Sequence, residues 1–164
     1  MAGPGRAQAA RLIALLLPLA LLAGAFGSQY LGGLYPCEMC WWQRYAHGAA
    51  VILAALAFTG PAASTRSRSL TLLAALAIAV SGAIGVYHAG VELKIFEGFT
   101  TCATTAKATS TAELLKKLMK VPLIRCDQVQ WSFLGISMAG WNAIISLSGA
   151  VAVVWLTLTS RRAR

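Results

Sequence analysis

The chain carries little charge for its length of 164 residues. Only 12% of its residues are charged and 58% are hydrophobic, whereas about a quarter of a soluble domain is charged. This shortage excludes an ordinary water-soluble domain and indicates that lipid surrounds the folded chain. Acidic residues are especially scarce, with five Asp and Glu against 14 Lys and Arg, for a net charge of +9.

That excess of positive charge is not typical of nucleic-acid binding here. A basic surface for nucleic acid needs a continuous cluster of cations, but in this chain the cations lie between apolar stretches. We interpret them as anchors at the edges of a membrane.

Long apolar runs dominate what is present. Each is close to the ~20 residues that a spanning helix needs, and the runs are continuous rather than alternating as in barrel strands. We therefore predict an all-α membrane protein, a four-transmembrane-helix bundle forming a single integral membrane domain over residues 1–164. The predicted helices cover about 12–30, 41–59, 70–90 and 131–158, and the two loops on the cysteine side cover about 31–40 and 91–130.

The first apolar run has a second interpretation, as a secretory signal peptide. Arg6 and Arg11 would form its basic region, and Ala23-Gly24-Ala25 resembles a cleavage site. The run continues past that site, and its removal would leave three spans. We favour a retained helix.

Charge predicts the orientation only with the help of context. Seven basic residues fall on each side of the bundle, but one set lies in the termini and the short connection at 60–69, where the positive-inside rule applies best. Persistent disulfides also need an oxidising compartment. We predict a multi-pass protein of the bacterial inner (cytoplasmic) membrane with both termini cytoplasmic and the cysteines periplasmic.

The segment from Glu92 to Gln130 has the most soluble character. Ser110 and Glu113 have capping-box spacing, and leucines then fall on one helical face with lysines around it between Leu114 and Lys120. This pattern predicts a short amphipathic surface helix in the second periplasmic loop. Packing on a protein partner is the alternative.

Two cysteine pairs carry the chemistry. Cys37 and Cys40 form a Cys-x-x-Cys before the second span, and Cys102 and Cys126 lie in the second loop. In a four-span protein these two connections emerge on the same side, so the four thiols can meet at one membrane face. This arrangement suggests electron transfer between disulfides, with lipid as a possible source of the acceptor.

Other uses of cysteine and histidine fit less well. A structural zinc site needs four ligands with close spacing, but the second pair is 24 residues apart, so we predict no metal. Covalent haem needs His directly after the second cysteine, and Trp41 stands there. A b-type haem between His47 and His88 and a non-catalytic scaffold braced by two disulfides stay open as alternatives.

Three features favour redox work. Cys40 begins a helix, whose dipole stabilises a thiolate. Arg44 is one turn further on, where a guanidinium can lower the pKa of the thiol and bind an anionic or carbonyl oxygen; snorkelling to the interface is the alternative. His88, near the outer end of the third span, can protonate a bound oxygen; a hydrogen-bonded interfacial histidine is the alternative.

Three segments together resemble one known family. Cys37-Glu-Met-Cys40-Trp-Trp-Gln-Arg44 resembles the Cys-x-x-Cys-x-x-x-Arg of the DsbB disulfide-bond formation proteins. Tyr87-His88-Ala-Gly-Val-Glu92 is similar to the end of the family's third helix. Cys126-Asp127, with Trp131 and the run from Gly135 to Asn142, is similar to the entry into the fourth. Gln43 departs from relatives that carry an acid at that position.

The resemblance implies an enzyme, a disulfide-generating oxidoreductase. It would reoxidise a periplasmic DsbA-like thioredoxin-fold protein and pass the electrons to a membrane quinone, ubiquinone or menaquinone. By this likeness the partner attacks a Cys102–Cys126 disulfide at Cys102, and the electrons move on to Cys37–Cys40. Cys40 would then face the quinone, while Arg44 and His88 hold its ring oxygens.

Overall fold

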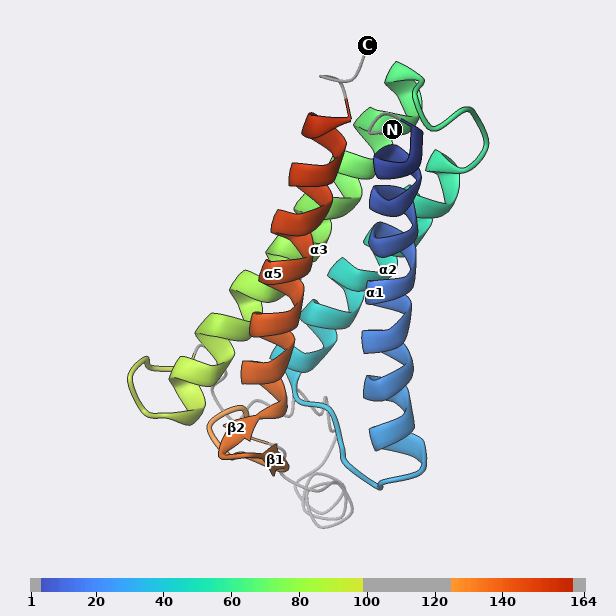
Figure 1. Ribbon diagram of the computed structural model, residues 1–164. Coiled ribbons are helices and arrows are strands. Elements are labelled where there is room, and N and C mark those ends of the chain that lie inside the picture. The colour runs from blue at the N-terminus through green and yellow to red at the C-terminus, as the bar shows by residue number, and fades with distance from the viewer. Residues whose placement is uncertain (1–3, 99–124, 161–164) are drawn as a thin grey trace, which may run out of the picture.

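The computed structural model describes residues 4–98 and 125–160, and helices dominate it (Figure 1). Within these residues four helices are present: α1 (Pro4–Tyr30), α2 (Glu38–Ala57), α3 (Thr65–Glu92) and α5 (Met138–Thr159). A hairpin of β1 (Ser132–Phe133) and β2 (Ile136–Ser137) precedes α5. Cys102 and the predicted surface helix lie outside the described residues.

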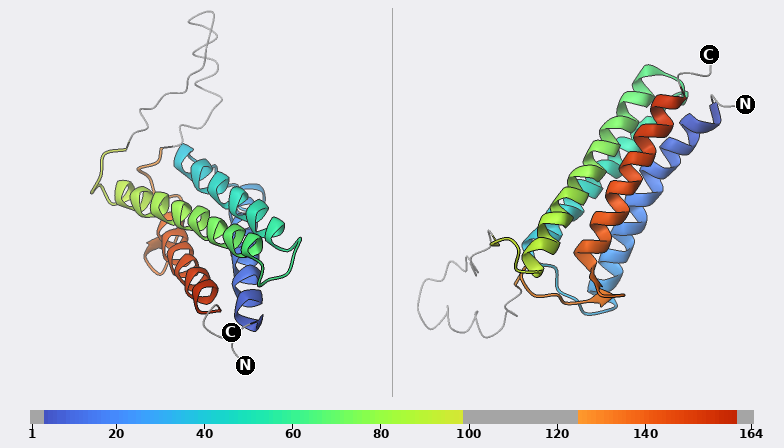
Figure 2. Two further views of the ribbon diagram at one scale, coloured as in Figure 1. Left: turned by 90° about the horizontal axis from the view of Figure 1, so that it is seen from above. Right: turned by 60° about the vertical axis from the view of Figure 1, so that its left-hand side comes forward.

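The helices pack as a closed ring. α2 contacts α1 and α3, while α5 contacts α3 and α1. Figures 1 and 2 show both chain ends and the α2–α3 connection at one end of the bundle, and the hairpin at the other. The Cys-x-x-Cys, at the start of α2, lies at the hairpin end. The prediction of an all-helical bundle is therefore confirmed for the described residues.

Three of the helices are long and apolar enough to cross a membrane: Gly5–Tyr30, Thr65–Glu92 and Met138–Thr159. α2 is not one of them. It has 20 residues, and its first half carries Gln43, Arg44 and His47. These polar side chains belong to the candidate site described below.

The helices extend beyond the apolar runs that predicted them. α1 begins at Pro4 rather than at about residue 12, and α3 begins at Thr65 rather than at about residue 70. The Ser64 side chain accepts a hydrogen bond from the backbone N–H of Ser67 and so caps α3. Hydropathy marks only the apolar part of a helix, whereas a cap marks its first turn.

The predicted start of the last helix at about Trp131 is wrong. Residues 132–137 form the hairpin, in which Ser132 pairs with Ser137 and Phe133 with Ile136. Leu134 and Gly135 at its turn have φ of 52° and 77°, and positive φ at both central residues is typical of a type I′ turn. α5 begins only after Ser137, whose side chain accepts from the Gly140 N–H. Hydropathy missed this boundary because the hairpin is also apolar.

Small residues let α3 and α5 approach closely. A Cβ added at Gly85 would lie 3.0 Å from the carbonyl oxygen of Ala139 and 3.1 Å from the backbone nitrogen of Ala143. A Cβ at Gly82 would meet the Leu147 side chain at 2.8 Å. Backbone contact of this kind is a common basis of helix association in membranes.

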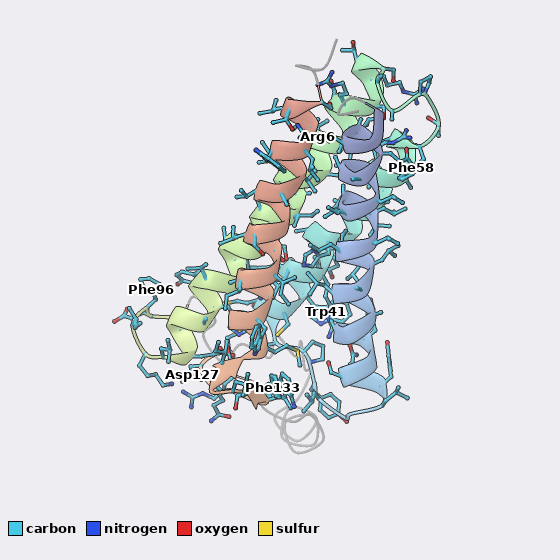
Figure 3. The ribbon with its side chains drawn as sticks, viewed as in Figure 1. Arg6, Trp41, Phe58, Phe96, Asp127 and Phe133 are labelled. Atoms are coloured by element: carbon cyan, nitrogen blue, oxygen red, sulfur yellow. The ribbon has the colours of Figure 1, made fainter. Side chains whose placement is uncertain are left out.

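Two arginines, the buried Arg11 and the partly exposed Arg68, connect helices at the end of the bundle that carries the termini, where Figure 3 labels Arg6 and Phe58. The Arg11 guanidinium donates to the carbonyl oxygens of Ala57 at 3.0 Å and Gly60 at 2.8 Å. It therefore binds carbonyl groups that the end of α2 leaves open. Arg68 donates to the carbonyl oxygen of Thr157 near the end of α5 at 2.7 Å.

Candidate functional site

The two cysteines of the Cys-x-x-Cys lie side by side at the first turn of α2. Cys37 is the N-cap residue, and its Sγ accepts a hydrogen bond from the backbone N–H of Cys40. The two Sγ atoms are 2.8 Å apart. A disulfide needs about 2.05 Å, while two thiolates on one tetrahedral zinc ion, each at about 2.3 Å from the metal, would lie about 3.8 Å apart. The distance fits neither, and the two cysteines are thiols in contact without a disulfide bond in this structure.

Cys126 joins this pair from a distant part of the sequence. It is 3% exposed and belongs to a buried cluster with Cys37, Met39 and Val91, against which Cys40 packs. The hydrogen bond between the Cys126 and Cys37 side chains raises the pKa of the Cys37 thiol, and a second bond with Cys40 and burial raise it further. Cys37 therefore keeps its proton, which leaves Cys40, at the helix start, as the sulfur suited to carry negative charge.

Ion pairs hold the segment that carries Cys126. The Asp127 carboxylate accepts from Lys94 Nζ at 2.6 Å and from Arg125 Nη2 at 2.7 Å. The hydrogen bonds from Arg125 and then from Lys94 keep the pKa of Asp127 well below its usual range. Because Lys94 lies two residues after the end of α3, these pairs tie the chain at residues 125–127 to the end of that helix. Figure 3 labels Asp127 at this end, close to Phe133 of the hairpin.

His88 faces the sulfurs from α3. Its Nε2 is 3.6 Å from Cys37 Sγ and 3.8 Å from Glu92 Oε1, and its Nδ1 is 3.0 Å from Gln43 Nε2. Cys37, Cys40 and His88 each offer a ligand atom within 4.8 Å of the others. They are three donors that a soft metal ion accepts, one fewer than a closed structural zinc site needs.

Arg44 points elsewhere in this structure. Its guanidinium donates to Gln29 Oε1 and, at 3.0 Å, to the carbonyl oxygen of Ala25, so it links α2 to α1. The rings of Phe26 and Trp41 lie 4.9 and 5.0 Å from the guanidinium carbon. Such stacking orients the cation at the wall of the site.

A cavity of about 610 Å³ connects these groups. This volume is in the usual range of small-molecule sites. α1 provides an apolar wall that includes Leu21, Leu22 and Ala25. The polar lining comes mainly from the other helices and includes Cys40, Gln43, Arg44, His47, His88 and Asn142.

Sequence reasoning missed part of this polar lining. Gln43 was noted only as a departure from relatives, and Asn142 only as part of a resemblance. Asn142 Nδ2 donates to Gln43 Oε1 at 2.7 Å, and Asn142 Oδ1 is 2.9 Å from His47 Nε2. A signal existed, because Gln43 and His47 are four residues apart, as are Asn142 and Ser146. Polar pairs on one face of an apolar helix indicate a functional interior.

The same contacts disfavour haem between His47 and His88. The amides of Gln43 and Asn142 bridge the two imidazoles by hydrogen bonds. An iron porphyrin between the rings would have to displace both amides.

Comparison with known proteins identifies the family. The family model described as "Disulfide bond formation protein DsbB" matches residues 7–156. The chain belongs to the DsbB family. Its relatives include proteins called "Disulfide bond formation protein B". One from Marinobacter nauticus is 30% identical over 132 residues, covering 76% of each chain. One from a Polaromonas species is 30% identical over 157 residues, covering 89% of this chain and 86% of the relative.

A third relative, from Xanthomonas oryzae pv. oryzae, is 29% identical over 137 residues, with coverage of 81% and 80%. No solved structure matches this one significantly. As a DsbB-family member, the chain is a membrane protein of disulfide bond formation and a disulfide-generating oxidoreductase. The haem and scaffold alternatives are therefore not favoured.

Proposed function

We propose that this enzyme reoxidises a DsbA-like thioredoxin-fold protein of the periplasm and delivers the electrons to a membrane quinone. The observation that carries the proposal is the meeting of Cys126, Cys37 and Cys40 beside a largely apolar cavity. The balanced reaction converts one partner dithiol and one quinone into a partner disulfide and a quinol. Either ubiquinone or menaquinone satisfies this balance.

The cavity residues suit a lipophilic acceptor with two oxygens. Most of the wall on α1 is apolar, while Arg44, His47, His88 and Asn142 place hydrogen-bonding groups around the remainder. Arg44 and His88 are the residues that we propose to hold the ring oxygens. When bound, a quinone would supply a two-electron acceptor, and the chain's own part is to present Cys40 to it and to exclude water.

Electrons would move through the cysteines by disulfide exchange. The partner thiolate attacks Cys102 of a Cys102–Cys126 disulfide, and Cys126 leaves with the electron pair. The Cys126 thiolate then attacks Cys37, which forms Cys126–Cys37 and releases Cys40 as the thiolate. The contact between the Cys126 and Cys37 side chains supports this order of attack.

The partner's second thiolate then attacks the mixed disulfide, which completes the partner disulfide and releases Cys102. The Cys102 thiolate attacks Cys126 of Cys126–Cys37, which restores Cys102–Cys126 and releases Cys37. Loss of two electrons from Cys37 and Cys40 to the acceptor finally restores their disulfide. The two protons that the partner's thiols gave up pass to the quinone, which becomes the quinol.

We further propose that all four helices span the inner membrane as one domain, with the termini cytoplasmic and the cysteines periplasmic. Two observations support this arrangement. α2 is the fourth member of the ring, whose other three helices are long and apolar enough to cross a membrane. The chain ends lie at the opposite end of the bundle from the Cys-x-x-Cys (Figure 1). The polar face of α2 would then be covered by the bundle rather than by lipid.

The test is anaerobic turnover with ubiquinone or menaquinone and a reduced thioredoxin-fold partner. We expect quinol and oxidised partner to form in equal amounts. Cys40→Ala should abolish quinol formation, because Cys40 is the sulfur presented to the acceptor. Cys126→Ala should block electron transfer from the partner, while a small dithiol still drives quinone reduction through Cys37 and Cys40. Failure of the wild-type enzyme to form quinol would refute the proposal.

A further inference from the structure

A chain of buried polar side chains crosses the interior of the bundle between the two histidines. His47 and His88 are only 3% and 4% exposed, and no water is needed to connect them. The chain joins α2, α3 and α5 and consists of His88, Gln43, Asn142 and His47, with Ser81 and Ser146 beside it.

The direction of its first hydrogen bond follows from elementary chemistry. Gln43 Nε2 is 3.2 Å from the backbone carbonyl oxygen of Met39, which can only accept. The amide orientation of Gln43 is therefore determined, with Nε2 as donor and Oε1 as acceptor. Nε2 also lies 3.0 Å from His88 Nδ1, so that nitrogen must accept. A neutral His88 then carries its proton on Nε2.

The next two hydrogen bonds have the same direction. Asn142 Nδ2 donates to Gln43 Oε1 at 2.7 Å, which turns Asn142 Oδ1 toward His47. That oxygen accepts from His47 Nε2 at 2.9 Å and from Ser146 Oγ at 3.0 Å. His47 Nδ1 is buried without a hydrogen-bond partner among the described residues. A second proton there would be an unpaired buried donor, so His47 is neutral with its proton on Nε2.

The tautomer of His88 matters because its Nε2 faces a reactive sulfur. This nitrogen lies 3.6 Å from Cys37 Sγ and 3.8 Å from the Glu92 carboxylate, and the backbone of Cys126 also hydrogen-bonds the His88 ring. With the proton on Nε2, His88 is a hydrogen-bond donor to the sulfur. With the proton on Nδ1, it would turn a lone pair toward the sulfur and could only accept.

We infer that Gln43 and Asn142 are positioning residues that hold His88 in the Nε2–H tautomer. His88 then donates to Cys37 when that sulfur leaves as a thiolate, in the step in which the Cys102 thiolate attacks Cys126 of the Cys126–Cys37 disulfide. The new Cys102–Cys126 bond forms as the old bond breaks, and Cys37 takes the electron pair. Stabilising a leaving thiolate speeds exchange. The role of His88 in this step rests on the proposed function.

A purely structural role is the competing explanation, because side-chain amides often bind helices together in membranes. Loss of stability on mutation would fit both explanations. Only the positioning role predicts that substitutions of Gln43 and Asn142 change which nitrogen of His88 carries the proton. The chain has just two histidines, which makes that nitrogen directly observable.

The first experiment is ¹⁵N NMR of the full-length reduced protein, labelled at histidine and purified through a tag without histidine. We expect both histidines to show a protonated Nε2 and an unprotonated Nδ1, with His47→Asn providing the assignment. A wild-type His88 with its proton on Nδ1 would overturn the inference. This readout needs neither quinone nor partner, so it can fail or succeed independently of the proposed function.

Two variants then test the cause. In Gln43→Glu an ionised carboxylate cannot donate to His88 Nδ1, so we expect that nitrogen to become protonated. In Asn142→Leu the Gln43 oxygen loses its donor, so we expect the His88 signals to shift toward a mixture of tautomers. Gln128→Glu introduces the same charge at the cavity wall and should leave the His88 tautomer unchanged. If Gln43→Glu and Asn142→Leu lower thermal stability but leave the His88 nitrogens as in the wild type, the amides are structural only.

The kinetic consequence is measured last. The rate at which quinol forms in a single turnover, which requires release of Cys37, should fall in Gln43→Glu by roughly 10²-fold, the lower end of what a positioned proton donor contributes. A normal rate in a Gln43→Glu enzyme whose His88 carries its proton on Nδ1 would overturn the proposed role in releasing Cys37.

Discussion

The three described cysteines differ in hydrogen bonding and in local charge. The Cys37 thiol lies between Cys126 and Cys40 and keeps its proton, whereas Cys40 lies at the positive end of the α2 dipole. His88 approaches Cys37, while Arg44 is turned toward α1. These contacts support the proposal that Cys37 exchanges with Cys126 and that Cys40 reacts with the acceptor, although both Cys37 and Cys40 line the cavity.

Asp127 offers a residue-scale prediction in acid. Its ion pairs with Arg125 and Lys94 lower its pKa from the ordinary value of about 3.9. The pairs therefore stabilise the fold above about pH 4, and that contribution is lost as the pH falls through the lowered value. Asp127 is the only aspartate in the chain, so ¹³C labelling of aspartate follows one carboxyl group.

We expect the Asp127 carboxyl signal to titrate below pH 3.9 in the wild type. Lys94→Met should move the midpoint upward while leaving the contact with Arg125. A wild-type midpoint at the ordinary value would show that the ion pairs do not hold the segment next to Cys126 in solution.

At the scale of elements, close helix contact and capping decide where the site is built. α3 and α5 touch through Gly82 and Gly85, and this approach brings Asn142 within reach of Gln43. The hairpin delays the start of α5 until Met138, which places Asn142 in its second turn. A shift of either helix would separate the amides that connect the two histidines.

Gly85→Ala tests this packing. The added methyl would meet the Ala139 oxygen, the Ala143 nitrogen and Asn142 Nδ2 at 3.0–3.1 Å. We expect a loss of about 1–3 kcal/mol in the free energy of unfolding, as in other overpacked interiors. Equilibrium unfolding in detergent measures it.

Gly48→Ala in α2 is the matched control, because nothing lies within 4 Å of its added Cβ. Removing a glycine from an open helix position should stabilise the protein by roughly 0.5–1 kcal/mol. Equal effects of the two substitutions would contradict a tight α3–α5 contact.

For the whole molecule, the closed ring of helices separates two ends with different roles. One end holds the chain termini and the buried Arg11, and the other holds the three described cysteines, the hairpin and the ion pairs of Asp127 (Figure 3). The cavity lies toward the second end, between a mainly apolar wall on α1 and polar groups mainly from the other helices. This division suits a protein that meets a soluble donor on one side of a membrane.

The four-span arrangement predicts opposite sides for the two ends. In a variant without native cysteines, a membrane-impermeant maleimide added to whole cells should label Leu134→Cys in the hairpin. It should label Ala63→Cys, in the α2–α3 connection, only after the membrane is permeabilised. Both native residues are exposed. If α2 does not cross, the α2–α3 connection stays on the side of the cysteines and the hairpin lies on the other side. Labelling of Ala63→Cys but not of Leu134→Cys in intact cells would therefore mean that α2 does not cross the membrane.

The sequence by itself determined what depends on neighbours along the chain. Apolar runs predicted the helices, and the spacing of Cys40 and Arg44 placed both on the first turns of one helix. The helix boundaries were predicted less well. The hairpin at 132–137 is as apolar as the start of a helix, so hydropathy placed the last helix too early. The direction of a side chain could not be predicted from the sequence. Arg44, for example, donates a hydrogen bond to a carbonyl oxygen of α1.

Only the tertiary structure decided which distant residues meet. Cys126 lies against Cys37, Asn142 links Gln43 to His47, and Arg11 closes the end of α2. Each contact joins residues from different helices, and its distance depends on how those helices rotate and approach. Local hydrogen bonding and hydropathy set the helices, but packing between small residues sets their approach, and no pattern within one segment encodes it.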